Sequence, residues 1–109
     1  MSKGREAATA EVFFALGDET RLSVLNKLGT QGALSATALS DGAVVTRQAI
    51  VKHLQVLEGA GLVRHERHGR EVLYSLETRR LELARSFLER VSQRWDRALE
   101  RLRELVEEP

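Results

Sequence analysis

The residues of this chain with the clearest potential for chemistry lie in one stretch, TRQAIVKHLQVLEGAGLV, from Thr46 to Val63. Ile50, Leu54 and Leu57 recur at i, i+4 and i+7, the pattern of a helix packed on a core. The opposite side of that helix would present side chains that can pair with base edges: glutamine with adenine, arginine with guanine, and valine with a thymine methyl group. The residues on this face are Arg47, Gln48, Val51, Lys52 and Gln55.

The start of the same helix offers a further contact. The Thr46 hydroxyl can cap the first turn, and backbone N–H groups at a helix start favour a phosphate, so Thr46 joins the candidate DNA contacts. The simplest alternative is a solvated helix surface, because Arg, Gln and Lys are common on any helix. Together with the short helix expected before it and the hairpin expected after it, the face favours nucleic acid.

Positive charge is concentrated around this stretch. The whole chain has 17 Lys and Arg against 16 Asp and Glu, a formal net charge of +1. From Thr46 to Glu71 there are five basic residues and three histidines against three glutamates, whereas residues 1–45 hold four basic against five acidic residues. A local surplus of this size suits nucleic acid without proving it.

The composition limits the other classes of function. A chain of 109 residues with 42% hydrophobic residues predicts one domain, residues 1–109. The absence of cysteine excludes disulfides, thiolate metal sites and thiol redox sensing. No signal peptide or membrane-length apolar run is present, so we expect a cytoplasmic protein without a membrane partner. No nucleophile elbow, phosphate loop or metal-activating cluster appears, so we expect neither an enzyme nor a cofactor.

Two helices are expected before the candidate face. Residues 7–16 carry apolar side chains at helical spacing, and Gly17 would end that helix. Asp18 can cap a second helix, which would end at Gly29. The side chains expected to be buried on the second helix are Leu22, Leu25 and Leu28.

A short helix and a hairpin complete the central part of the chain. Ser35 would begin a helix of about two turns, with Leu34, Ala38 and Leu39 as a small apolar patch. Val72, Tyr74 and Leu76 alternate in the manner of a strand, and HG between charged residues is a plausible turn, so residues 62–76 are expected to form a β-hairpin. The tip of the hairpin is basic, so Arg67 and Arg70 would hold phosphates or a minor groove.

The last segment, residues 78–108, is expected to form one long helix. Its apolar residues are spaced alternately by three and four, which is a heptad seam. A helix of about 30 residues runs about 45 Å, longer than a domain this small can cover, so we expect a second copy as partner. A helix lying across its own core would explain only the first half of the seam. The seam consists of Leu81, Ala84, Leu88, Val91, Trp95, Ala98, Leu102 and Leu105.

This order of elements, mainly α with a small β-hairpin, is that of a winged helix-turn-helix. FFALGDETRLSVLNKL, followed by LSATALSDGAVVTRQAIVKHLQVLEGAGLVRHERHGREVLYSL, resembles the ArsR family of bacterial transcriptional repressors. The most specific motif is KHL..LE.AGLV, which covers the recognition helix, its end and the entry to the wing. The resemblance runs from about Phe13 to Leu76 and continues into a terminal helix that contains tryptophan.

The resemblance implies a homodimer that represses an inverted-repeat operator in double-stranded DNA and is released by an inducer, often a metal ion. The first and last helices, residues 1–17 and 78–108, would pair across a two-fold axis. The helix-turn-helix would span about 34–60 and the wing 62–76. With the seam described above, the expected dimerisation residues are Phe13, Leu81, Leu88, Val91, Trp95 and Leu102.

The chain departs from the metal-sensing members of the family. Their sites use cysteines, or histidines and acids along the last helix, and this chain has neither cysteine nor a histidine in that helix. His65 and His68, three apart on a strand, would point to opposite faces and lack further ligands. We therefore expect no metal site, and the existence and identity of an inducer stay open. His53 borders the buried stripe, so a structural role is favoured over DNA contact.

Two alternatives remain open from the sequence. A winged helix used as a protein-interaction module would keep the core and the dimer helix but would not need Arg47, Gln48 or Arg67. A steep fall of DNA affinity with salt would separate the two functions. The aromatic residues of the terminal helices could also line a pocket, although their periodicity favours a dimer core. These residues are Phe13, Phe14, Phe87 and Trp95.

Overall fold

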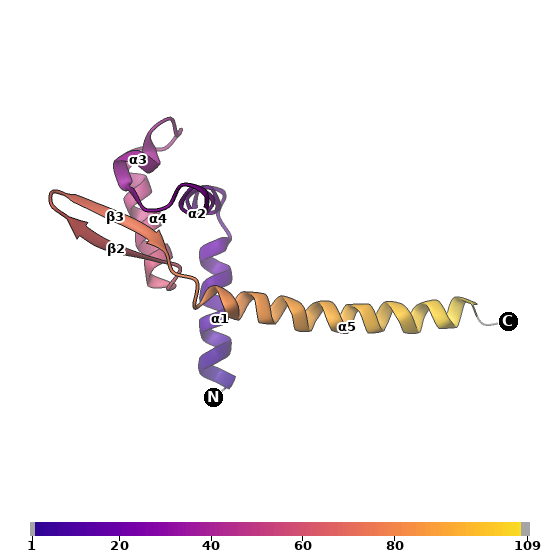
Figure 1. The fold of residues 1–109 in the computed structure, drawn as a ribbon. Coiled ribbons are helices and arrows are strands. Elements are labelled where there is room, and N and C mark those ends of the chain that lie inside the picture. The colour runs from indigo at the N-terminus through magenta and orange to yellow at the C-terminus, as the bar shows by residue number, and fades with distance from the viewer. Residues whose placement is uncertain (1, 108–109) are drawn as a thin grey trace.

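The computed structural model describes residues 2–107 as a mainly helical chain with a small antiparallel sheet (Figure 1), which confirms the predicted fold class. The elements are α1 Ser2–Leu16, α2 Glu19–Gln31, β1 Leu34–Ser35, α3 Ala36–Ser40, α4 Arg47–Gly59, β2 Val63–His68, β3 Glu71–Leu76 and α5 Leu81–Glu107. Strand β1 is short and leads directly into α3.

The three helices between α1 and β2 each begin at a polar side chain that accepts a backbone N–H of the first turn. This satisfies a donor that would otherwise lack an intrahelical partner. The predicted caps Asp18 and Thr46 are therefore confirmed, and Ser35 caps the helix that it was expected to begin. Asp18 Oδ2 accepts from the N–H of Arg21 at 3.0 Å, Ser35 Oγ from the N–H of Ala38 at 3.1 Å, and Thr46 Oγ1 from the N–H of Ala49 at 3.1 Å.

One hydrophobic core joins α1, α2, α3 and α4 to the base of the sheet. The predicted stripe of α4 is confirmed, because its three members are at most 1% exposed. Burial of such aliphatic side chains contributes about 1.5–3 kcal/mol each relative to exposure. The largest fully buried side chains are Leu39, Ile50, Leu54, Leu57, Leu62 and Val12.

Helix α2 differs from its prediction. Leu22 is 51% exposed and Leu25 is only half-buried, whereas Val24 and Leu28 are buried. Steps of three residues drift around a helix by about 60° each, so a 22, 25, 28 stripe cannot face one core, whereas an i, i+4 pair can. The helix also runs two residues beyond Gly29 and ends at Gly32, which has a φ of 84°.

Helix α3 is shorter than the predicted two turns, with five residues. Because it begins at Ala36, the i, i+3 pair of Ala36 and Leu39 faces the core. Ala38 is exposed, so its predicted place in the apolar patch was wrong.

The hairpin forms as predicted and becomes part of a sheet with the strand order β1-β3-β2. Val63 lies opposite Leu76 at its base, and His68 lies opposite Glu71 at its tip. The two-residue turn between them begins at Gly69, whose φ of 64° is one that glycine adopts without steric cost.

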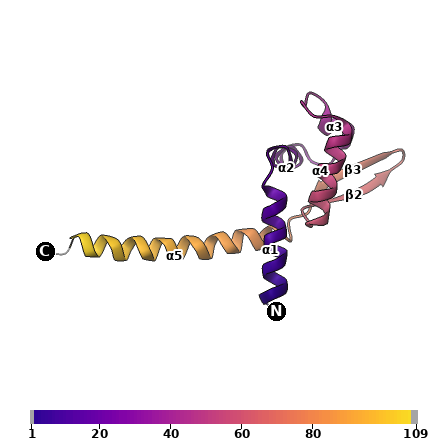
Figure 2. The ribbon, with the colours of Figure 1, turned by 180° about the vertical axis from the view of Figure 1, so that it is seen from behind.

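Helix α5 begins at Leu81 instead of residue 78. Glu77, just before the predicted start, still pairs with the residue that leads into β2, because its N–H donates to the carbonyl of Leu62 at 2.8 Å. The helix then leaves the body of the protein, as both views show (Figures 1 and 2). The radius of gyration is 18.7 Å, against roughly 13 Å for a compact domain of this length. None of the helices within residues 2–107 combines the length and apolar character of a membrane span.

Candidate nucleic-acid interface

Helix α4 separates its side chains into a buried and an open face, as the sequence predicts. While its apolar stripe is locked into the core, Thr46 and the polar residues of the opposite face are exposed and Val51 is half-buried. A helix held in this way presents its outer side chains on a rigid element, which is what reading base edges requires. The exposed residues of the face are Arg47, Gln48, Lys52 and Gln55.

Arg47 is held by a residue that the sequence analysis did not single out. Its Nε donates to the Thr37 Oγ1 of α3 at 3.0 Å. The bond uses only Nε, so the two terminal nitrogens of the guanidinium group take no part in it. An arginine can pair with guanine through these terminal nitrogens. The partners are ten residues apart, so only the packing of α3 against α4 brings them together.

A groove of about 910 Å³ runs between α3, the start of α4 and strand β3. It brings together three of the predicted contacts, Arg47, Val51 and Arg70. Gln48, Lys52, Gln55 and Arg67 do not line this groove; the first three continue along α4, and Arg67 lies on β2. The groove is also lined by hydroxyl residues that the sequence did not mark as candidates, among them Ser35 and Thr37. A hydroxyl of this kind can donate to a phosphate oxygen.

The wing tip is exposed and keeps its positive charge available. Arg67 Nη1 makes only a long contact, 3.5 Å, to the carbonyl of Gly69. Among residues 2–107, no carboxylate forms an ion pair with Arg47, Lys52, Arg67 or Arg70. Unpaired cations of this kind are the groups that neutralise phosphates and release counterions.

The histidines of the wing each contact a nearby glutamate. His65 Nδ1 lies 2.8 Å from Glu58 Oε2 at the end of α4, and His68 Nε2 lies 3.2 Å from Glu66 Oε1. The part of the chain that the structure describes contains no group of three His, Cys, Asp or Glu residues placed to hold a metal ion.

His53 fixes α4 against the first two helices. Its side chain is 23% exposed, and its Nδ1 lies 3.3 Å from Arg21 Nη1 and 3.7 Å from Asp18 Oδ2. Arg21 in turn donates from Nε to the carbonyl of Ala15 at 2.7 Å and from Nη2 to that of Phe14 at 3.2 Å, at the end of α1. These contacts agree with the structural role predicted for His53.

The pKa of the Asp18 carboxyl is lowered from its ordinary value of 3.8. The main cause is the hydrogen bond that it accepts from the backbone N–H of Arg21, and the charges of His53 and Arg21 also lower it against an opposing effect of desolvation. A carboxyl with a lowered pKa stabilises the folded protein above its unfolded pKa, and that stability is lost as the pH falls through the folded pKa.

The variant Asp18→Asn tests this contribution, because asparagine also caps helices but carries no charge. We expect the wild type to unfold at a higher urea concentration than the variant at pH 7. The difference should shrink as the pH falls below about 4, and it should approach zero when Asp18 is protonated in both states. A difference that is independent of pH would show that the Asp18 charge does not stabilise the fold.

A helix-turn-helix with an exposed polar face and a basic hairpin defines the class of protein: a winged helix-turn-helix. Residues 16–66 match the family model described as a helix-turn-helix domain. HTH-type transcriptional regulator YuzN of Bacillus subtilis (strain 168) is 43% identical over 65 residues, covering 54% of this chain and 71% of that protein.

Solved structures narrow the class to a family. The ArsR-like transcriptional regulator from Rhodococcus sp. RHA1 has 40% identity and a TM-score of 0.81, with 98% of this chain and 97% of that one covered. The homodimeric winged helix-turn-helix DNA-binding domain Mb0332 of Mycobacterium bovis has 27% identity and a TM-score of 0.68, with 92% and 89% covered. This chain belongs to the ArsR family of transcriptional regulators.

Proposed function

We propose that the protein is a homodimeric repressor that reads an inverted-repeat operator through α4 and holds the DNA backbone with its wing. Its role is binding, without catalysis, and it acts in the cytoplasm. The proposed base-reading and helix-start contacts are Thr46, Arg47, Gln48, Val51, Lys52 and Gln55, and the proposed backbone contacts are Arg67 and Arg70.

The observation that carries the proposal is the exposed polar face of α4 on a helix whose opposite side is buried in the core. Arg47 is steadied by Thr37 at 3.0 Å, and the Ile50 side of the helix is anchored in the core. Since Gln48 and Arg47 are exposed near the start of the helix, they are available to pair with bases when that end enters a major groove. Repression would follow where the operator overlaps a promoter, because the bound dimer and polymerase exclude each other.

The dimer is supported by the surface of α5. Among the described apolar residues of α5 beyond Val91, Ala98 is half-buried and the others are exposed. Trp95, for example, is 64% exposed and Leu105 is 74% exposed. Apolar surface of this extent marks an interface. The related domain from Mycobacterium bovis is described as homodimeric, and a two-fold dimer would place two α4 helices toward successive major grooves.

Sedimentation of the protein, alone and with DNA, tests the proposed function. The DNA is a duplex carrying the inverted repeat nearest the promoter of its own gene, compared with a scrambled duplex at low and moderate salt. A dimer that binds this duplex in preference to the scrambled one is the expected result. A dimer that ignores both duplexes at low salt would contradict the proposal and favour a protein-interaction module.

The variant Arg67→Ala tests the role of the wing. Because a phosphate contact carries little sequence information, affinity should fall equally for operator and random DNA. The slope of log affinity against log salt should become shallower by about 0.9 for each protomer. Arg79→Ala, which removes the same charge at an exposed position before α5, is the control. Loss of affinity for the operator alone would assign Arg67 to base reading instead.

A further inference from the structure

The hydroxyl of Thr37 on α3 is placed differently from those of two other helical threonines. Thr9 Oγ1 donates to the carbonyl of Arg5 at 2.8 Å. Thr30 Oγ1 likewise donates to the carbonyl of Asn26 at 3.1 Å. In both cases the acceptor lies four residues earlier, a common partner for a threonine inside a helix. Thr37 is the second residue of α3, so the carbonyl four residues before it lies ahead of the helix.

The oxygen of Thr37 instead accepts a hydrogen bond from a different element. Arg47 Nε, at the start of α4, donates to it at 3.0 Å. A hydroxyl that accepts one bond keeps its own proton, and that proton can turn toward a second acceptor. Thr37 is exposed and lines the groove between α3, the start of α4 and β3. A DNA backbone lying along this groove would supply such an acceptor, because phosphate oxygens accept from hydroxyl groups.

Both partners of this bond lie on helices that are anchored in the core. On α3, Ala36 is 4% exposed and Leu39 is 1% exposed. On α4, Ile50 is 1% exposed. Threonine is also branched at Cβ, which limits its side chain to few rotamers. The hydroxyl of Thr37 is therefore held at a defined place beside Arg47 before any DNA arrives.

The bond decides which edge of Arg47 is offered to DNA. An arginine side chain has several rotatable bonds, so an untethered one can turn to a phosphate as readily as to a base. With Nε bonded to Thr37, the Nη1 and Nη2 edge points away from that bond. This edge can donate two parallel hydrogen bonds to O6 and N7 of guanine. Ordering the side chain in advance also lowers the entropy that DNA binding costs.

We propose that Thr37 is a specificity-determining residue that couples a backbone contact to base reading. Its oxygen holds Arg47 toward a guanine, and its hydroxyl proton goes to a neighbouring phosphate. Thr37 therefore contacts DNA itself and also positions the side chain that reads a base. The inference rests on the proposed function, because it requires the start of α4 to enter a major groove.

The test compares Thr37→Val, which keeps the branched shape without the hydroxyl, with Thr37→Ser, which keeps the hydroxyl. Fluorescence anisotropy measures binding of each full-length protein to the operator, to its single-base variants and to random DNA. Arg47→Ala first identifies the operator position at which preference for guanine is lost. Thr37→Val should reduce the preference at that same position by about three- to tenfold. Thr37→Ser should keep it within about twofold of the wild type.

Two further measurements separate this role from a loss of folding or of charge. In the Arg47→Ala background, Thr37→Val should lower base preference no further, because the two side chains act as one unit. The dependence of affinity on salt should not change, since a hydroxyl carries no charge. Thr78→Val is the matched control, because it removes a hydroxyl from an exposed position between β3 and α5, outside the groove. It should bind as the wild type does.

Unchanged guanine preference in Thr37→Val would overturn the inference. So would an Arg47→Ala protein that keeps its preference for guanine, or a Thr37→Ser protein that loses as much as the valine variant. If the wild type prefers the operator while Thr37→Val behaves in the same way, the proposed function stands and only the role of Thr37 fails. A wild type that does not distinguish operator from random DNA contradicts both.

Discussion

Leu102→Glu is expected to convert the dimer into a monomer that still folds. Leu102 is 57% exposed in the single chain, so its replacement removes little from the core. In the proposed dimer, the same position lies in the α5 seam, where two carboxylates would lose water without gaining a partner. A penalty of about 3 kcal/mol or more raises the dimer dissociation constant by more than about 100-fold.

Sedimentation equilibrium measures this effect, and urea unfolding of the monomer checks the fold. Gln93→Glu is the matched control, because it adds the same charge to α5 at an exposed position outside the seam. We expect the control to remain dimeric and to keep its operator affinity. A dimeric Leu102→Glu protein would show that the outer half of α5 does not form the interface.

Gln48→Ala is expected to relax base preference without weakening general DNA binding. A lost bidentate pair with adenine removes about 1–3 kcal/mol of discrimination, which is about 5- to 150-fold. Fluorescence anisotropy with the operator, with single-base variants of each half-site and with random DNA measures the change. Affinity for random DNA should stay within about twofold, because phosphate contacts dominate it.

Gln93→Ala is the control for Gln48→Ala, since it removes the same side chain from an exposed position on α5. The proposed division of roles fails if Gln48→Ala and Arg67→Ala reduce affinity by the same factor on operator and on random DNA. Discrimination lost at one base position of the operator would identify the base that Gln48 reads.

The exposed polar face of α4 and the helix starts were predictable because they depend on local pattern. The i, i+4, i+7 stripe of α4 specifies its buried side, and with it the outward side of Gln48 and Lys52. Asp18 and Thr46 cap their helices through hydrogen bonds to the backbone three residues further on. Both partners of each bond therefore lie within one short stretch of the sequence.

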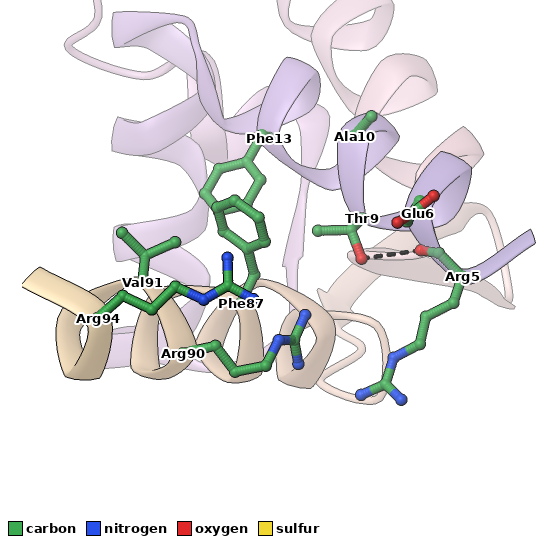
Figure 3. Close-up of a pocket in the computed structure, with 9 residues that line it drawn as sticks. All are labelled: Arg5, Glu6, Thr9, Ala10, Phe13, Phe87, Arg90, Val91 and Arg94. Carbon is green, nitrogen blue, oxygen red and sulfur yellow. Dashed lines mark hydrogen bonds between the residues drawn. The ribbon is translucent and has the colours of Figure 1, made fainter. Parts of the chain in front are cut away.

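Tertiary contacts explain what the sequence did not reveal. The bond between Arg47 and Thr37 depends on the packing of α3 against α4, and no spacing in the sequence signals it. The contact between Phe13 of α1 and Phe87 of α5 (Figure 3), with ring centroids 5.5 Å apart, similarly depends on the packing of two helices that are distant in the chain. The exposure of Leu22 was predictable in principle, because the drift of a three-residue step around a helix is a geometric fact.

The most direct test of the central claim is methylation interference on the operator with dimethyl sulfate, which modifies guanine N7 in the major groove and adenine N3 in the minor groove. If two α4 helices read one inverted repeat, methylated guanines should interfere in two successive major grooves, about 34 Å apart on one face of the DNA. Interference confined to adenines of the minor groove, or found in one half-site alone, would contradict recognition by a dimer through α4.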